Sequence, residues 1–191
     1  MTFAEHTLQR RVHFSSLWTV EDLIYAEFGP LLNTTTHHHA FDDHYQLLNA
    51  SYATALPSAV EAIRPHLSNF WSAPPKDFEE LYERVRLIIE PIKGIGRLAI
   101  YDTAIHIGCN LLPRIIPERY VYMTCDKVED SAMILLDTTK YSIKNHRIEA
   151  SAFSSIIPHY GAMEIEDVLC LYHEMIKKFG KFEIQWLYAI P

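Results

Sequence analysis

Apolar residues recur at helical spacing in two long segments of the chain. In residues 77–92 and 164–179 they fall at i, i+3 and i+4 positions, which places them on one face of a helix. The first segment opens with Asp77 followed by Glu80, which resembles a capping box with aspartate in place of serine or threonine. Acidic residues at the start of the second segment and lysines at its end complement a helix dipole. Both segments are therefore predicted to be helices.

Weaker patterns and turn residues predict the remaining elements. Further helices are expected over residues 19–32, 41–48, 58–67 (with Pro57 near its start) and 97–107, with Gly108 as the C-cap of the fourth. Another is expected from residue 126 or 127 to residue 136. Residues 33–39 and 68–75 are expected to be loops, residues 140–155 a short helix or an extended loop, and the aromatic tail 182–191 to pack onto the body. No alternating strand is convincing. The prediction is an all-α fold: one compact helical domain, residues 1–191, in which residues 1–75 can form a small lobe on residues 76–191.

The sequence Gly94-Ile95-Gly96 lies between the predicted helices 77–92 and 97–107. Glycines tolerate the backbone angles of a tight reversal, and Ile95 can tuck beneath it. Such a hairpin exposes the first free N–H groups of the second helix and the positive end of its dipole, which is a favourable place for a phosphate. The plain alternative is an ordinary αα-hairpin turn.

The charge balance is acidic overall but basic around this hairpin. The net charge is −7, which counts against a general nucleic-acid binder. Residues 84–119 nevertheless contain six basic residues against three acidic ones. A local positive footprint suffices for a protein that grips a few phosphates, and the acidic remainder lowers indiscriminate binding.

Other features exclude several classes of protein. No apolar run approaches the roughly 18–20 residues that a membrane span needs, and the N-terminus lacks the layout of a signal peptide. The three cysteines, Cys109, Cys125 and Cys170, form no C-x-x-C pair, which favours a reducing cytoplasm over a disulfide framework or a zinc site. A histidine-rich loop at residues 37–44 could in principle hold a divalent ion, but it lacks H-x-x-x-H spacing, so no metal site is predicted.

The hairpin and its neighbourhood, residues 78–136, resemble the helix-hairpin-helix DNA glycosylase superfamily, most specifically at residues 93–97. The resemblance implies that double-stranded DNA is the partner and that a base is flipped into a pocket beside the hairpin. It also implies that no cofactor is required, although hairpin carbonyls could hold a monovalent cation. The DNA-binding residues would be Lys93, Gly94, Ile95, Gly96 and Arg97, with Lys127 at the start of the following helix.

The resemblance also directs attention to particular catalytic positions. The lysine of bifunctional members corresponds to Leu98, which implies a monofunctional enzyme in which water attacks the sugar. The superfamily's catalytic aspartate corresponds to Tyr122, so the acid must lie elsewhere. Asp102, one turn after Leu98, is the first candidate and Asp126 the second. Tyr101, Leu98 and Tyr122 are the candidates for contact with the base or for orienting water.

Structural alternatives stand beside each of these assignments. Asp102 could hydrogen-bond a neighbouring backbone group or pair with Arg97 or Lys93, and Tyr101 and Tyr122 could be core aromatics. The leading hypothesis is a monofunctional DNA glycosylase for a modified or damaged base. Small proteins of this kind also resemble anti-phage glycosylases that remove hypermodified cytosine. The alternative is a non-catalytic helix-hairpin-helix module that binds DNA or protein, followed by a metal-dependent nuclease that uses the histidine-rich loop.

Overall fold

The computed structural model describes residues 52–137, 139–158 and 160–180. The predicted helices 19–32 and 41–48, the loop 33–39 and the tail 182–191 lie outside these residues. Contacts between Cα atoms divide the chain into a first unit, Met1–Ile116, and a second unit, Pro117–Pro191.

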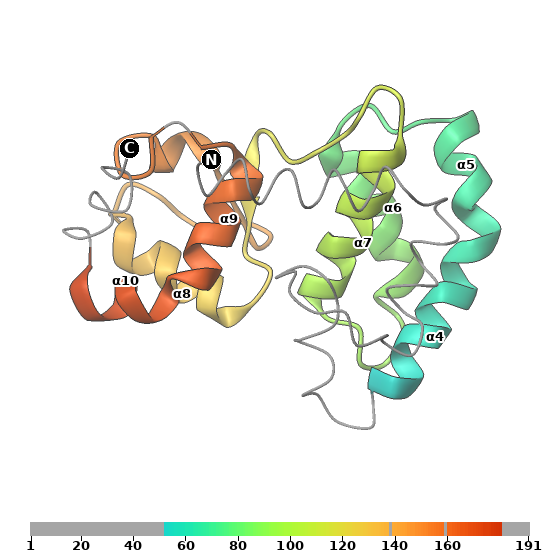
Figure 1. Cartoon of the computed structure of the whole chain (residues 1–191), viewed down its shortest axis with the longest axis horizontal. Helices are drawn as coiled ribbons and strands as arrows, with labels where there is room; N and C mark the ends of the chain where they lie inside the picture. Colours follow the sequence, from blue (N-terminus) through green and yellow to red (C-terminus); the bar gives the residue numbers. More distant parts are fainter. Residues whose placement is uncertain (1–51, 138, 159, 181–191) are drawn as a thin grey trace. The chain divides into compact units, whose positions relative to one another are not determined.

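In the first unit, four α-helices and a 3₁₀ turn follow one another along the described residues. They are α4 (Tyr52–Ile63), η1 (Arg64–His66), α5 (Leu67–Ser72), α6 (Phe78–Ile89) and α7 (Arg97–Asn110). Helix α6 packs against both α4 and α7 (Figure 1). Helix α7 is buried along most of its length, so it forms the centre of the unit.

The first predicted helix of this unit differs from the structure. Helix α4 begins at Tyr52, so Pro57 lies inside the helix, and the helix ends at Ile63, immediately before the 3₁₀ turn that contains Pro65. The predicted loop 68–75 is also wrong in part, because its first residues continue α5. Leu67 and Phe70 are buried on α5, and this apolar pair explains why the segment is helical.

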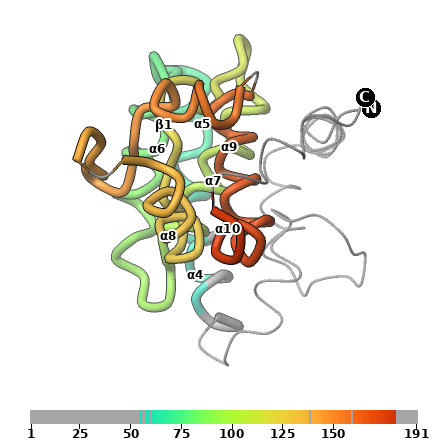
Figure 2. The backbone as a smooth tube through the Cα atoms, turned by 90° about the vertical axis from the view of Figure 1, so that its left-hand side faces the viewer, coloured from blue at the N-terminus to red at the C-terminus, as the bar shows by residue number. Residues whose placement is uncertain are grey.

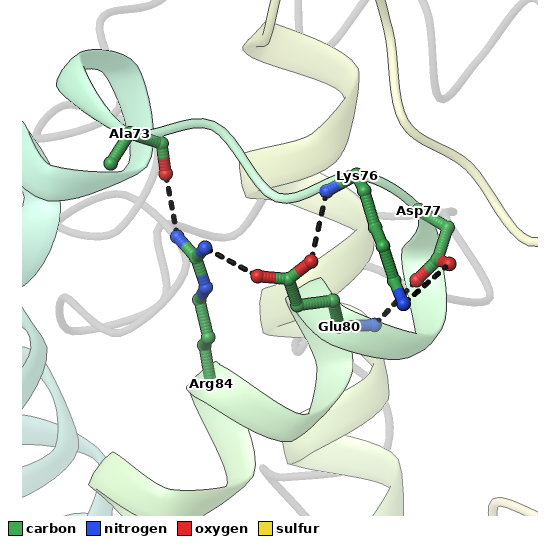
Figure 3. A network of polar contacts seen from close by, with 5 residues as sticks. All are labelled: Ala73, Lys76, Asp77, Glu80 and Arg84. Carbon is green, nitrogen blue, oxygen red and sulfur yellow. Dashed lines mark hydrogen bonds and ion pairs between the residues drawn. The ribbon is translucent and has the colours of Figure 1, made fainter.

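The start of α6 confirms the predicted cap. The Asp77 carboxylate accepts a hydrogen bond of 2.8 Å from the Glu80 amide. The Glu80 carboxylate in turn accepts from the Lys76 amide at 3.1 Å and pairs with Arg84 at 2.5 Å. Arg84 also donates to the carbonyl of Ala73 at 2.6 Å, which ties the end of α5 to the first turn of α6 (Figure 3). Side chains thereby satisfy two amides before the backbone ladder of α6 begins.

The prediction that Gly108 ends the helix as its C-cap is wrong. Gly108 lies inside α7. The helix continues to Asn110, and the Ile115 amide donates to the Gly108 carbonyl at 3.0 Å. A Cβ atom on Gly108 would lie 1.9 Å from the Ile115 carbonyl oxygen and 2.9 Å from a methyl group of Leu81. The glycine is thus required because the chain returns against the helix at this point.

The second unit combines helices with a small sheet. Strands β1 (Tyr120–Tyr122) and β2 (Arg147–Glu149) pair antiparallel, with Val121 opposite Ile148. The helices are α8 (Asp126–Leu135), α9 (Ala162–Leu171) and α10 (His173–Phe179), together with the 3₁₀ turn η2 (Ala150–Phe153). Helix α8 packs against α9 and α10, which Figure 2 also shows, and α9 contacts β1.

The fold is therefore mostly helical, as predicted, with a two-stranded sheet that the all-α prediction omitted. Each strand is three residues long, too short to show the alternation by which strands are recognised. Tyr120 of β1 makes cation–π contacts with two arginines: the guanidinium groups of Arg119 and Arg147 lie 4.8 Å and 4.7 Å from its ring centre.

The predicted helix 164–179 is two helices that meet at Tyr172. Ser131 on α8 donates a 2.7 Å hydrogen bond to the carbonyl of Leu169, the group that would accept the His173 amide in an uninterrupted α-helix. The Ser131 hydroxyl also lies 3.0 Å from His173 Nδ1. As a result His173 and Ile176 are buried, whereas Met175 and Phe179, predicted for the same apolar face, are exposed.

Candidate functional site

The connection between α6 and α7 is short and internally hydrogen-bonded. The Ile92 amide donates to the Ile89 carbonyl at 3.1 Å, and the Ile95 amide donates to the Ile92 carbonyl at 3.0 Å. Gly94 has φ 100°, a backbone conformation that glycine adopts without the cost that a side chain brings. The predicted reversal between the two helices thus lies at Gly94.

The start of α7 is uncapped and lies at the surface. Gly96 is the N-cap residue, it is exposed, and no side chain caps the helix. A Cβ atom on Gly96 would meet no atom within 4 Å. The first helical carbonyl bond is that from Ile100 to Gly96, so the amides of Leu98 and Ala99 have no carbonyl partner within the helix. This open helix start can accept an anion.

The basic surplus around this turn is smaller than the sequence suggests. Arg84 pairs with Glu80 at 2.5 Å, and Arg86 pairs with Glu83 at 2.6 Å and also with Glu90. The hydrogen bond to Glu83 is the main reason that the pKa of Arg86 lies above its usual value. The charges of these two arginines are therefore balanced by carboxylates of α6 and its C-cap.

Two further basic residues, Lys93 and Arg97, lie at the turn itself. Lys93 is exposed and forms no ion pair with the described residues, and Arg97 is half-buried as the first residue of α7. Of the other predicted DNA-binding positions here, Gly96 is exposed, and Gly94 and Ile95 are half-buried. All five predicted contacts are thus at least partly accessible to a ligand.

The predicted catalytic and pocket residues of α7 lie deeper in the unit. Asp102 is 1% exposed, and Leu98, one turn earlier, is half-buried. Tyr101 is fully buried, with its ring edge-on to that of Phe78 at a centroid distance of 5.8 Å. Tyr101 is thus packed as a core aromatic residue, which was the structural alternative to its predicted contact with a base. A base could stack on the Tyr101 ring only if the contact with α6 opened.

The remaining predicted site residues belong to the second unit. Tyr122, the last residue of β1, is 3% exposed and lies opposite Arg147 in the sheet. Asp126 and Lys127 are exposed at the start of α8. The predicted site is therefore divided, with the hairpin and Asp102 in one unit and Tyr122, Asp126 and Lys127 in the other.

A cluster that the sequence did not predict lies in the second unit. Glu166 and Asp167, expected to complement the dipole at the start of a helix, are fully buried on α9. Thr124 donates a 2.5 Å hydrogen bond to the Glu166 carboxylate. Cys125 follows as the N-cap of α8, and Cys170 lies one turn beyond Glu166. The sequence offered one signal of this cluster, namely that Glu166 and Asp167 are adjacent acidic residues among apolar ones. Their burial could not be predicted from it, because it depends on packing against residues about 40 positions away, such as Thr124.

The structure also bears on metal binding and membrane insertion. Within the described residues, no group of three or more histidine, cysteine, aspartate or glutamate side chains is placed to hold a metal ion. The histidine-rich loop at residues 37–44 lies outside them. In the same part of the chain, no helix combines the length and the apolar character that a membrane span requires.

Comparison with known proteins gives no further assignment: no protein family, no curated protein sequence and no solved structure matches this chain.

Proposed function

We propose that this protein binds the phosphodiester backbone of double-stranded DNA through the start of α7. The observation that carries the proposal is the exposed, uncapped Gly96, around which a side chain would meet open space. Amides that lack a helical partner, together with the helix dipole, favour a phosphate oxygen at this point. Lys93 adds an exposed positive charge next to it.

The acidic balance of the rest of the chain fits a limited contact with the backbone. The net charge of −7 disfavours broad electrostatic attachment, so binding would depend on the few groups at the turn. A contact with one or two phosphates gives a shallow dependence of affinity on salt, with a slope of about −0.9 per phosphate neutralised. We expect DNA binding to be detectable at low salt and weak at high salt.

Substitution of Gly96 by aspartate tests the proposal and separates binding from folding. An aspartate at the N-cap accepts the helix-start amides and is a favourable cap, so stability should be unchanged or rise by a few tenths of a kcal/mol. The same carboxylate occupies the phosphate position and repels the DNA. We expect Gly96→Asp to weaken binding to a labelled duplex at least about tenfold, as measured by fluorescence anisotropy at low salt.

Ser68→Asp is the matched control, because it adds the same charge at an exposed position of α5. Its affinity for DNA should stay within about twofold of the native chain, since a single added charge outside the contact acts only through the general field of the protein. Equal affinities of the native chain and Gly96→Asp would contradict the proposed contact. Equal losses in Gly96→Asp and Ser68→Asp would show that net charge, and not the start of α7, governs binding.

Base excision is a second candidate function, and it is favoured by the position of Asp102. This carboxylate is buried inside the unit. It lies on α7 one turn beyond Leu98, on the same helix whose start forms the proposed phosphate contact. In a water-poor site, a carboxylate would strongly stabilise the positive charge that develops on the sugar when a glycosidic bond breaks. The mechanism would be monofunctional, with water as the nucleophile and no Schiff base, because Leu98 stands where a lysine would be needed.

The variant Asp102→Asn tests this second candidate. We expect it to lower base release at least about 100-fold while leaving the affinity for DNA unchanged. The assay would use DNA with varied base modifications, hypermodified cytosine included, and would detect free bases by mass spectrometry and abasic sites by alkaline cleavage. Asp130→Asn, which alters an exposed carboxylate of α8 with no predicted role, is the matched control. Binding without release of any base by the native chain would favour the non-catalytic module, and activity retained in Asp102→Asn would exclude Asp102 from the reaction.

A further inference from the structure

Two cysteines meet where the start of α8 packs against α9 in the second unit. The contact is fixed by the hydrogen bond of 2.5 Å from the Thr124 hydroxyl to the Glu166 carboxylate, both of which are buried. Cys125 directly follows Thr124, and Cys170 lies on α9 one turn after Glu166. The same anchor therefore brings the two thiols together, and each is half-buried, so a small reagent can reach them.

The surroundings of the two sulfur atoms are different. The pKa of Cys125 falls to about 5, first through the interaction of its sulfur with the Cys170 thiol and further through the Val128 and Lys127 amides at the start of α8. The pKa of Cys170 is raised by this same contact, by burial and by the charges of Glu166 and Asp167. Near neutral pH the pair therefore consists of one thiolate and one thiol.

We propose that Cys125 and Cys170 form a peroxide-reactive pair, in which Cys125 attacks the oxidant and Cys170 closes a disulfide. The Cys125 thiolate attacks one oxygen atom of hydrogen peroxide, the O–O bond breaks, and a sulfenic acid and hydroxide result. The Cys170 sulfur then attacks the Cys125 sulfur, so the S–S bond forms and the S–O bond breaks. The proton of Cys170 leaves with the departing hydroxyl group as water. Peroxide is reduced by two electrons and the pair of sulfur atoms is oxidised by two.

The third cysteine provides an internal reference. Cys109 is buried on α7 in the first unit and has no place in the proposed pair. Its thiol should react slowly, because it is buried near the end of α7 and not at a helix start. Differences in reactivity between Cys109 and Cys125 can thus be measured within one native molecule, with no need for a variant.

The test begins with the reduced native chain. A stoichiometric amount of hydrogen peroxide should lower its mass by two hydrogen atoms, and peptide mapping without reductant should recover a Cys125–Cys170 disulfide. Iodoacetamide labelling of Cys125 should change less than about twofold between pH ~6 and pH ~8, because the thiolate persists at pH values above about 5. An ordinary thiol with a pKa of about 8.5 should gain more than about 20-fold over the same interval.

Variants then separate the two roles. In Cys170→Ser the sulfenic acid of Cys125 should persist and react with dimedone, and in Cys125→Ser the uptake of peroxide should fall at least about tenfold. Cys109→Ser should behave as the native chain does. The proposal would be overturned by equal labelling rates and pH profiles of all three cysteines in the native chain. Cross-links that involve Cys109, or oxidation without a disulfide between Cys125 and Cys170, would overturn it equally.

Discussion

Replacing Gly108 by alanine should destabilise the first unit by about 2 kcal/mol or more, although alanine is the better helix former. The added methyl group would lie 1.9 Å from the Ile115 carbonyl oxygen, which is backbone and cannot rotate away. The returning chain would have to shift, and the 3.0 Å hydrogen bond from the Ile115 amide to the Gly108 carbonyl would be strained or lost. Urea unfolding followed by circular dichroism would measure the loss.

Gly96→Ala is the matched control for this experiment. Gly96 has φ −108°, which every residue adopts, and its Cβ position is open, so alanine there should change stability by no more than about 0.5 kcal/mol. A loss of the same size in both variants would show that the close approach of Ile115 to α7 does not distinguish the two glycines.

Truncating Phe78 to alanine should cost about 3–5 kcal/mol, the largest single effect that we expect in the described residues. Phe78 is 2% exposed at the start of α6, and its ring meets Tyr101 edge-on at 5.8 Å. The variant removes this aromatic contact and leaves a cavity between α6 and α7. The midpoint of urea unfolding should fall, and the near-ultraviolet circular dichroism of the native state should change if the Tyr101 ring moves.

Leu87→Ala on the same helix is the control for Phe78→Ala. Leu87 is 62% exposed, so its truncation removes little buried surface and should stay within about 0.5 kcal/mol of the native chain. Comparable losses in the two variants would contradict the packing of α6 against α7 described above.

Local signals in the sequence predicted the elements that depend on near neighbours. The cap at Asp77 and the apolar spacing after it place α6 correctly at its start, because both features act within one or two helical turns. The start of α7 at Arg97 was also predicted, and the start of α8 at Asp126 is one of the two positions predicted for it. The turn at Gly94 follows from glycine's backbone freedom alone.

Features that depend on distant residues were missed. Gly108 looked like a helix end because the approach of Ile115 has no sequence signature, and strands of three residues pair through contacts 27 positions apart, as between Val121 and Ile148. The break before His173 depends on Ser131, a residue of another helix. Each of these departures arises from tertiary packing that overrides a local pattern.

In the candidate sites, too, features set by neighbouring residues were predicted and features set by distant residues were missed. The accessibility of the hairpin was predictable, whereas the neutralisation of Arg84 and Arg86 was not, because two of their partners, Glu80 and Glu83, lie before the basic stretch that was counted. The cysteine pair was missed because 44 intervening residues separate Cys125 from Cys170 along the chain, and the anchor that joins them is a single Thr124 to Glu166 contact.

The Glu80 side chain makes the hydrogen exchange of a backbone amide next to α6 depend on pH. Its pKa is lowered mainly by the hydrogen bond that it accepts from the Lys76 amide and next by the one that it accepts from Arg84, so the ionised form persists below the usual pH range for glutamate. Amides that precede a helix ordinarily exchange their hydrogen with water readily. The Lys76 amide should instead exchange slowly at neutral pH, and this protection should fade as acid protonates Glu80, since an uncharged carboxyl is a weaker acceptor.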